Sequence, residues 1–283
     1  MIDIIGIIFL ASLGLALLGF IISVFLSKSN IKEFWKELVI STIILIPVYM
    51  FMFIFPTILI IGSSDIGLPN DYLFLVIILS MLVIIIPFML YSYIVTPLIY
   101  LFFRKKSVDK ECTQIMNAQG CPGKVVIVDN SSIACTMGIT SKSQIIMIGR
   151  RLIDQLTKDE LFGILYHEIG HMKGKHLSKM LIVDIIGFLI LMIGIRYVNL
   201  WSDGNPYVVV PVAALLGGLL PFRRTFMRRY EKDADRYASN IVGKNVYISA
   251  LMKLNGLVDG RMNNYDIEHP KLGERINNIK NVI

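Results

Sequence analysis

Long apolar runs dominate the chain and are separated by short polar loops. They cover approximately residues 4–26, 38–62, 72–103, 180–198 and 206–222. A helix that crosses a bilayer needs roughly 20 consecutive apolar residues, so each run predicts a membrane-spanning helix. The third run is long enough for one tilted helix, whereas the fifth is short and contains Gly217 and Gly218. The last two runs therefore predict either two full spans or a shallow hairpin.

The composition indicates the same class of protein. Of the 283 residues, 55% are hydrophobic and only 17% are charged, which is typical of a membrane protein. The formal net charge is +7, but the basic residues gather beside apolar runs, at 104–106 and 223–229. This placement reflects membrane topology, with the lipid bilayer as a partner, and argues against nucleic acid. Cys112, Cys121 and Cys135 lack a CxxC spacing and predict free thiols. The composition indicates no particular oligomeric state.

The basic residues also predict how the helices are oriented. The loop at 27–37 holds three lysines, the loop at 63–71 holds no lysine or arginine, and basic clusters follow the third and fifth runs. Lys and Arg are enriched on the cytoplasmic side of membrane helices. The pattern predicts a multi-pass protein of the cell membrane, with its N-terminus outside and its polar segments and C-terminus in the cytoplasm.

Two polar segments remain outside the predicted spans. The predicted organisation is three transmembrane helices at 1–103, a first polar part at 104–178, a transmembrane hairpin at 179–222 and a second polar part at 223–283. Because neither polar part is large enough for a sizeable core of its own, we expect both to build one cytoplasmic domain.

The sequence of that domain predicts both strands and helices. β-Branched runs predict strands at 124–129, 132–137 and 144–148, in a small and mainly antiparallel sheet. Thr157 and Glu160 form a T-x-x-E capping box, which predicts a helix that runs to about residue 176. The second part predicts further helices, at 223–241 with Gly243 as the C-cap, near 245–255 and at the C-terminus.

The pentapeptide HEIGH, residues 167–171, lies within the capped helix. Residues four apart share a helix face, so His167 and His171 can bind one metal ion. Glu168 lies about 100° further around the helix axis, where its carboxylate can hold a metal-bound water. Zinc lowers the pKa of such a water toward about 7, and a carboxylate accepts its proton as it attacks a carbonyl carbon. HEIGH therefore predicts a catalytic zinc site for peptide hydrolysis, with Glu168 as the base.

Catalytic zinc sites take three protein ligands, and the chain offers three candidates for the third. His176 lies one residue too early for the HExxHxxGxxH pattern, and on a continuous helix it would point about 140° away from His171. His269 lies further along, in EHPKLGER. Glu231 is followed four residues later by Asp235, and such a pair offers a metal ligand and an acceptor for a ligating histidine. Spacing alone leaves these alternatives open.

Three motifs occur along the chain in the same order as in a known family. HEIGH, then EKDADRYA with its E-x-x-x-D spacing, then HPKLGERI resemble the HtpX-type membrane zinc metallopeptidases and the related CAAX prenyl endopeptidases, over about residues 104–283. The resemblance implies a membrane α-helical bundle with a small α+β, zincin-like (gluzincin) catalytic domain on the cytoplasmic side. It also implies one Zn²⁺ per chain as the cofactor and polypeptides as substrates.

The resemblance further assigns the residues of the site. It implies that Glu231 is the third ligand beside His167 and His171, and that Asp235 orients a ligating histidine, which we expect to be His167. His269 and Arg275 are expected near the substrate, where His269 stabilises the oxyanion that forms when water attacks.

One segment departs from the family pattern. The family commonly carries an N-A-F-A-T-G-like stretch before the metal-binding helix, and here the matching stretch IACTMG has Ile133 in place of the asparagine. Either Ser131 or Ser132 is then expected to take the polar role. The residues that follow, Ala134, Cys135 and Thr136, are still expected to pair with an extended substrate, since strand pairing uses backbone groups.

These features predict a membrane-bound zinc endopeptidase that cuts membrane or membrane-associated proteins at the cytoplasmic face, in quality control. The alternatives are a dedicated processing peptidase for prenylated or small precursor peptides, and a sensor that signals by proteolysis. Asp184, a few residues into the fourth apolar run, has two interpretations, a functional buried carboxylate or a hydrated group at the membrane edge.

Overall fold

The computed structural model describes residues 106–283 except 130, 140–143, 203–208, 265–268 and 282–283, together with Tyr93 and Phe102. The chain divides into two compact units, 1–103 and 104–283, and the second is described here. The predicted spans at 4–26, 38–62 and 72–103 lie outside the described residues, apart from Tyr93 and Phe102.

A four-stranded sheet forms one layer of the second unit. Its strands lie in the order β1 (Lys106–Asp109), β2 (Lys124–Val128), β4 (Ile145–Gly149) and β3 (Ala134–Met137). The outer pairs are antiparallel, whereas the central pair of β2 and β4 is parallel. The three predicted strands are confirmed, but the sheet is mixed, and β1 was not predicted. The parallel pairing places β4 at the centre, where every one of its residues is buried.

Helices cover this sheet. The helix α6 (Lys110–Ala118) connects β1 to β2, and α7 (Arg150–Gln155) leads from β4 into α8 (Lys158–Lys173). The predicted capping box is confirmed, because Thr157 Oγ1 accepts from the backbone of Glu160 and the Glu160 carboxylate accepts from the backbone of Thr157. The core between sheet and helices holds fully buried apolar side chains, among them Met116, Val125, Ile146, Ile148, Leu165 and Ile169.

The helix that carries HEIGH ends two residues after this motif. The sequence predicts a helix to about residue 176, but α8 ends at Lys173, and Lys175 has a left-handed φ of 52°. The next helix, α9 (His176–Ser202), starts immediately afterwards. A residue with a left-handed backbone conformation changes the direction of the chain. The side chain of His176 therefore does not point where it would on a continuous α8 helix.

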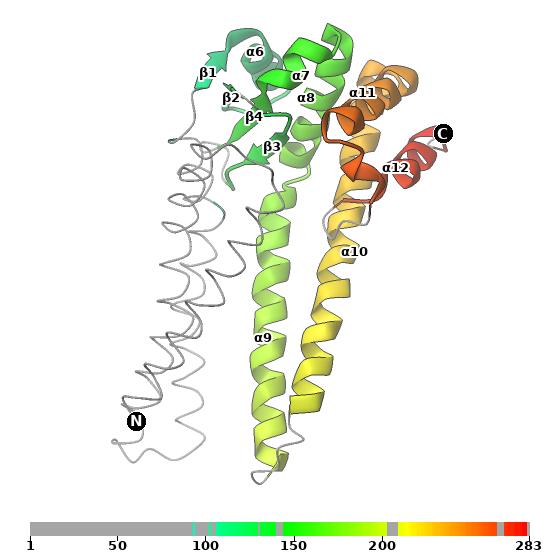
Figure 1. The fold of residues 1–283 in the computed structure, drawn as a ribbon. Helices are drawn as coiled ribbons and strands as arrows, with labels where there is room; N and C mark the ends of the chain where they lie inside the picture. The colour runs from blue at the N-terminus through cyan, green and yellow to red at the C-terminus, as the bar shows by residue number, and fades with distance from the viewer. Residues whose placement is uncertain are drawn as a thin grey trace, which may run out of the picture. The chain divides into compact units, whose positions relative to one another are not determined.

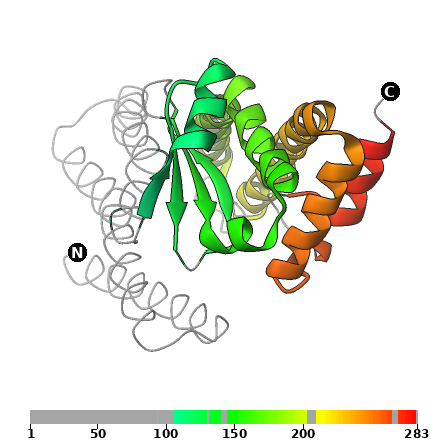
Figure 2. The same ribbon diagram turned by 90° about the horizontal axis from the view of Figure 1, so that it is seen from above.

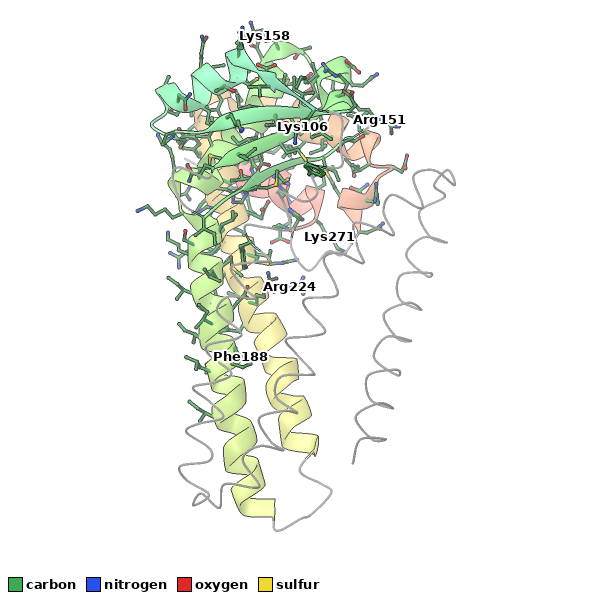
Figure 3. The ribbon with its side chains drawn as sticks, turned by 90° about the vertical axis from the view of Figure 1, so that its left-hand side faces the viewer. Lys106, Arg151, Lys158, Phe188, Arg224 and Lys271 are labelled. Carbon is green, nitrogen blue, oxygen red and sulfur yellow. The ribbon has the colours of Figure 1, made fainter. Side chains whose placement is uncertain are left out.

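Two long helices run side by side away from the sheet, α9 and α10 (Val209–Val242) (Figure 1). The predicted helix over 223–241 is the C-terminal half of α10, which continues through Pro221. The Asp184 carboxylate of α9 accepts from Arg223 Nε of α10 at 2.9 Å, so this carboxylate has a cationic partner. Figure 3 shows Phe188 and Arg224 on these two helices, away from the sheet. Among the described residues, no helix has the length and apolar character that a membrane crossing requires. The hairpin assigned to 179–222 stays a prediction.

The second half of α10 crosses α8 closely. A Cβ added at Gly170 would lie 3.0 Å from the Ala234 Cα, so the small residues let the two backbones approach. Gly243, with φ of 87°, separates α10 from α11 (Lys244–Leu257). A short turn η4 (Arg261–Asn263) and α12 (Leu272–Lys280) follow, and α11 and α12 lie beyond α8 on the side away from β1 (Figure 2). This crossing brings the ExxxD segment of α10 against the HEIGH segment of α8.

Candidate active site

Three side chains from α8 and α10 converge at the crossing. His171 Nε2 lies 3.1 Å from His167 Nε2 and 3.2 Å from Glu231 Oε1, and His167 Nε2 lies 3.6 Å from Glu231 Oε2. All three residues offer ligand atoms within 4.8 Å of one another. The side chains are 9%, 14% and 8% exposed for His167, His171 and Glu231. The structure thus brings together the three ligands that the resemblance implies.

The cluster fits a zinc ion. Zinc bonds of about 2.0–2.1 Å in a tetrahedron place neighbouring ligand atoms roughly 3.3 Å apart, close to the separations seen here. Glu231 Oε2 is buried and makes no hydrogen bond to any residue that the structure describes. Although burial raises the pKa of this carboxyl, His171, His167 and Arg275 together hold it well below its usual range. Glu231 is therefore an ionised carboxylate with an unused oxygen, which is what a metal ligand requires.

Asp235 contacts the outer nitrogen of His167. Its Oδ1 lies 3.0 Å from His167 Nδ1, which leaves Nε2 for the metal. Tyr247 donates its hydroxyl to the same Asp235 oxygen at 2.7 Å and lies 2.9 Å from His167 Nδ1. Arg275 Nε donates to Asp235 Oδ2 at 2.9 Å, and its Nη2 lies 3.1 Å from the Tyr247 hydroxyl. Burial raises the pKa of Asp235, but the charge and hydrogen bonds of Arg275 and His167 lower it to about 2. Asp235 is thus charged and fully partnered.

Arg275 has contacts other than those the sequence suggests. The resemblance places it near the substrate, and it does line the cleft beside the cluster. However, the residue is only 4% exposed, and its guanidinium is bonded to Asp235 and Tyr247. These contacts favour a role in fixing Asp235, because a buried carboxylate needs a compensating charge.

His171 has a different outer partner. Its Nδ1 lies 2.9 Å from the Nδ1 of His176, which is 4% exposed and stacks on the Tyr230 ring at 4.5 Å between centroids. Burial and the neighbouring His171 and Lys179 lower the pKa of His176 to about 3, so its ring is neutral. His176 is outside the ligand cluster but touches one of its members.

Glu168 lies between α8 and the edge strand β3. The Thr136 hydroxyl lies 2.8 Å from Glu168 Oε2 and 3.0 Å from the Glu168 backbone oxygen, so it can donate to either. Glu168 is 6% exposed, and it lines the same cleft as His167. Its carboxylate is thus held beside the ligand cluster without bonding to Glu231 or the two histidines' metal-facing atoms, as expected of a base that acts on bound water.

Among the described residues, no strand pairs with the outer edge of β3, which lies beside Glu168. Arg151 N donates to Ser131 O and Gly149 N donates to Ile133 O, which fixes the alternation of the β3–β4 ladder. By that alternation the backbone N–H and C=O groups of Ala134 and Thr136 point away from β4, toward the open edge. Cys135 points its backbone groups toward β4, and burial together with the charge of Glu168 raises the pKa of its thiol to about 12.

A cleft of about 350 Å³ opens between β3, α8 and α11. Ser132 and Ile133 lie on its β3 side, whereas the Ser131 hydroxyl is buried and accepts from the Ile133 backbone. Of the two serines, Ser132 is therefore the one that faces the cleft. The apolar lining on the α8 and α11 side consists of Ile164, Leu251, Leu254, Val258 and Met262.

His269 lies at the mouth of this cleft. Its Nε2 is 3.9 Å from Glu231 Oε1, and its side chain is half exposed. The imidazole is thus near the cluster but open to solvent, in a place where it can reach a bound peptide. The His269 assignment as an oxyanion stabiliser stays a prediction that this position favours.

Sequence reasoning missed the contact of Tyr247, whereas it left His176 as either a surface residue or an outer partner of a ligand. Tyr247 carries no motif, and the only signal for it was its place in the predicted helix near 245–255. The contact of His176 depends on the break at Lys175, for which Gly174, three residues after HEIGH, was the one available signal.

A family model described as peptidase family M48 matches residues 103–283. The chain belongs to peptidase family M48. M48 enzymes are zinc-dependent metalloproteases, which agrees with the cluster at His167, His171 and Glu231. Membership also agrees with a zincin-like catalytic domain of mixed helix and sheet.

Several M48 relatives are similar to this chain. Protease HtpX of Histophilus somni is 25% identical over 193 residues, which cover 58% of this chain and 67% of that protein. An HtpX homolog of Aeropyrum pernix is 30% identical over 149 residues, 47% of this chain and 46% of that protein. A Neisseria meningitidis homolog is 29% identical over 134 residues, 44% and 48% of the two chains. The chain thus matches about half the length of the last two relatives.

The fold has a solved counterpart. The crystal structure of Ste24p from S. mikatae matches with a TM-score of 0.57 and 22% sequence identity, over 88% of this chain and 65% of that one. At this identity the likeness shows a shared fold and carries no statement about substrates.

Proposed function

We propose that this M48 protein is a zinc endopeptidase that hydrolyses peptide bonds of membrane or membrane-associated polypeptides at the cytoplasmic face. The observation that carries the proposal is the convergence of His167, His171 and Glu231 from two crossing helices, with Glu168 beside them. Two imidazoles and one carboxylate are the ligand set of a catalytic zinc site that keeps one position open.

The residues around the cluster supply the remaining chemistry. A bound zinc ion would acidify water and polarise a substrate carbonyl. Glu168, held by Thr136, accepts the proton of the attacking water and later gives it to the leaving amine. Asp235 fixes the ring of His167, and His269 at the cleft mouth donates to the oxygen that gains negative charge.

The edge of β3 supports binding of an extended peptide. The backbone groups of Ala134 and Thr136 face the open edge, beside Glu168. A peptide placed antiparallel to β3 would add a strand to the sheet, with main-chain hydrogen bonds that do not depend on its sequence. Such binding suits an enzyme that cuts many polypeptides.

The apolar cleft supports a preference at one substrate position. It extends from Glu168 toward Ser132, just before the N-terminal end of β3. A peptide antiparallel to β3 runs toward that end with its C-terminal part, so the cleft would receive the side chain directly after the scissile bond. Leu251, Leu254 and Met262 would surround that side chain with apolar atoms.

A peptide pair can measure this preference. We expect a peptide with Leu directly after the scissile bond to have a kcat/KM roughly 10- to 200-fold higher than the same peptide with Gly there, because only Leu buries apolar surface in the cleft. The same exchange directly before the scissile bond serves as the control and should change kcat/KM less. Equal kcat/KM for the first pair would contradict the placement of the peptide.

Membrane attachment is supported by the outer face of α9. Ile182, Ile186, Ile190 and Ile193 are 55%, 45%, 42% and 48% exposed, and their spacing places them along one side of the helix. Exposed apolar stripes of this kind mark contact with lipid or with another apolar surface. Catalytic groups held at the end of such a helix would meet substrates in or near the bilayer, as expected in quality control.

Metal removal tests the function. The purified full chain, in detergent or vesicles, should cleave an unfolded membrane polypeptide, lose this activity with a chelator and regain it with stoichiometric Zn²⁺. A prenylated peptide assayed in parallel distinguishes general cleavage from dedicated processing. Cleavage that persists without bound metal would remove the proposed mechanism.

A further inference from the structure

His176 is the first residue of α9, directly after the break that follows α8. Its ring lies next to His171, a member of the ligand cluster. Its ring is buried, stacks nearly parallel to Tyr230 at an interplanar angle of 13°, and meets His171 edge-on at 5.0 Å between centroids. Gly174 leaves the necessary space, since a Cβ at that position would collide with the His176 ring. The ring is therefore fixed on two sides, and its one hydrogen bond to the cluster is the 2.9 Å contact between the Nδ1 atoms.

The tautomers follow from this geometry. Nε2 of His171 faces His167 and Glu231, so it must be free of hydrogen to bind a metal ion. The hydrogen of a neutral His171 ring is then on Nδ1, which donates to Nδ1 of His176. His176 in turn accepts at Nδ1 and carries its own hydrogen on Nε2. Each ligating histidine thus has an acceptor of its own, Asp235 for His167 and His176 for His171.

We propose that His176 is the positioning residue for His171, a neutral acceptor that fixes the tautomer and ring plane of this ligand. The inference rests on the proposed zinc centre and goes beyond it. Outer acceptors of ligating histidines are usually carboxylates or backbone carbonyls. A neutral imidazole in that place orients His171 without adding a second negative charge to the one from Asp235.

Variants at residue 176 separate the acceptor from the ring. Asn carries its Oδ1 at the same position from Cβ as Nδ1 of histidine, so His176→Asn keeps the acceptor and loses the stacking ring. His176→Phe keeps a ring against Tyr230 and loses the acceptor, and His176→Gln moves the acceptor one bond further out. Tyr230→Phe serves as a control that keeps both the stack and the hydrogen bond.

The readout is the Zn²⁺ dissociation constant of the full chain in detergent, measured by chelator competition, with circular dichroism to establish folding. We expect His176→Phe and His176→Gln to bind zinc about 10- to 100-fold more weakly than wild type. His176→Asn and Tyr230→Phe should stay within a few-fold of wild type. If His176→Phe does not fold, the comparison of Asn with Gln decides.

The outcomes are distinguishable. Folded His176→Phe with wild-type affinity would overturn the inference, as would an Asn variant that binds as weakly as Gln. Either result leaves the zinc centre itself intact. A wild-type chain that binds no zinc would instead overturn the proposed function.

Discussion

Glu168→Gln is expected to lower the kcat for peptide cleavage by at least about 100-fold while zinc stays bound. Gln has nearly the same shape and can still accept the hydrogen bond from Thr136, but its amide cannot take a proton from water. The ligand cluster of His167, His171 and Glu231 is untouched by the exchange. Metal analysis together with single-turnover cleavage of a peptide substrate measures both halves of the expectation.

The same helix offers a matched control. Asp159 lies in the first turn of α8 and is exposed, so Asp159→Asn removes a carboxylate of the same helix without touching the site. This variant should cleave like wild type. Wild-type turnover by Glu168→Gln would mean that another group accepts the proton.

Glu231→Ala is expected to abolish stoichiometric zinc binding. The exchange removes one of three ligands and the only carboxylate among them, so affinity should fall by more than the roughly 10- to 100-fold that follows loss of a ligand's outer partner. The exchange also removes the carboxylate that lies 3.2 Å from His171 Nε2. Zinc per chain after dialysis, measured by atomic absorption, should fall from one toward zero.

Glu274 provides the comparison for this variant. It lies on α12, is partly exposed, pairs with Arg228 at 3.2 Å and is not a member of the ligand cluster. Glu274→Ala should keep full zinc content, since partly exposed ion pairs contribute little to stability. Full zinc content in a folded Glu231→Ala protein would assign the third ligand to another residue, with His269 at 3.9 Å from Glu231 as the nearest alternative.

The parts of the fold that sequence predicted well are those with local causes. The start of α8 follows from the hydrogen bonds that Thr157 and Glu160 exchange within four residues. The strand at 124–129 and its partner at 144–148 follow from β-branched runs. The parallel pairing of these two strands does not follow from the sequence pattern, because it depends on the position of β3 at the outer edge of the sheet.

Two errors at helix boundaries have physical reasons. The end of the apolar run at residue 222 suggested a boundary there, but α10 continues from Val209 to Val242, and Pro221 inside it removes only one backbone donor. The break at Lys175 was not predicted, because lysine rarely adopts a positive φ, here 52°; the break is followed directly by His176, which packs against Tyr230.

The site shows the same division between local and distant causes. The spacings within HEIGH and between Glu231 and Asp235 place side chains on one face of a helix, so they can be recognised in the sequence. Both motifs contribute side chains to the ligand cluster or to its direct contacts. Tyr247 and Arg275 contribute through contacts 80 and 108 residues away from His167 in sequence, for which no periodic pattern exists. Both side chains donate to the buried carboxylate of Asp235, Tyr247 from α11 and Arg275 from α12.

The distance in sequence between the two halves of the centre also orders events during synthesis. The histidines of α8 leave the ribosome well before Glu231, and Arg275, which holds Asp235, is 40 residues later still than Asp235. A nascent chain therefore carries two imidazoles without their carboxylate ligand until α10 has been made and folded back across α8. The proposed zinc centre is therefore incomplete until most of the chain has been translated.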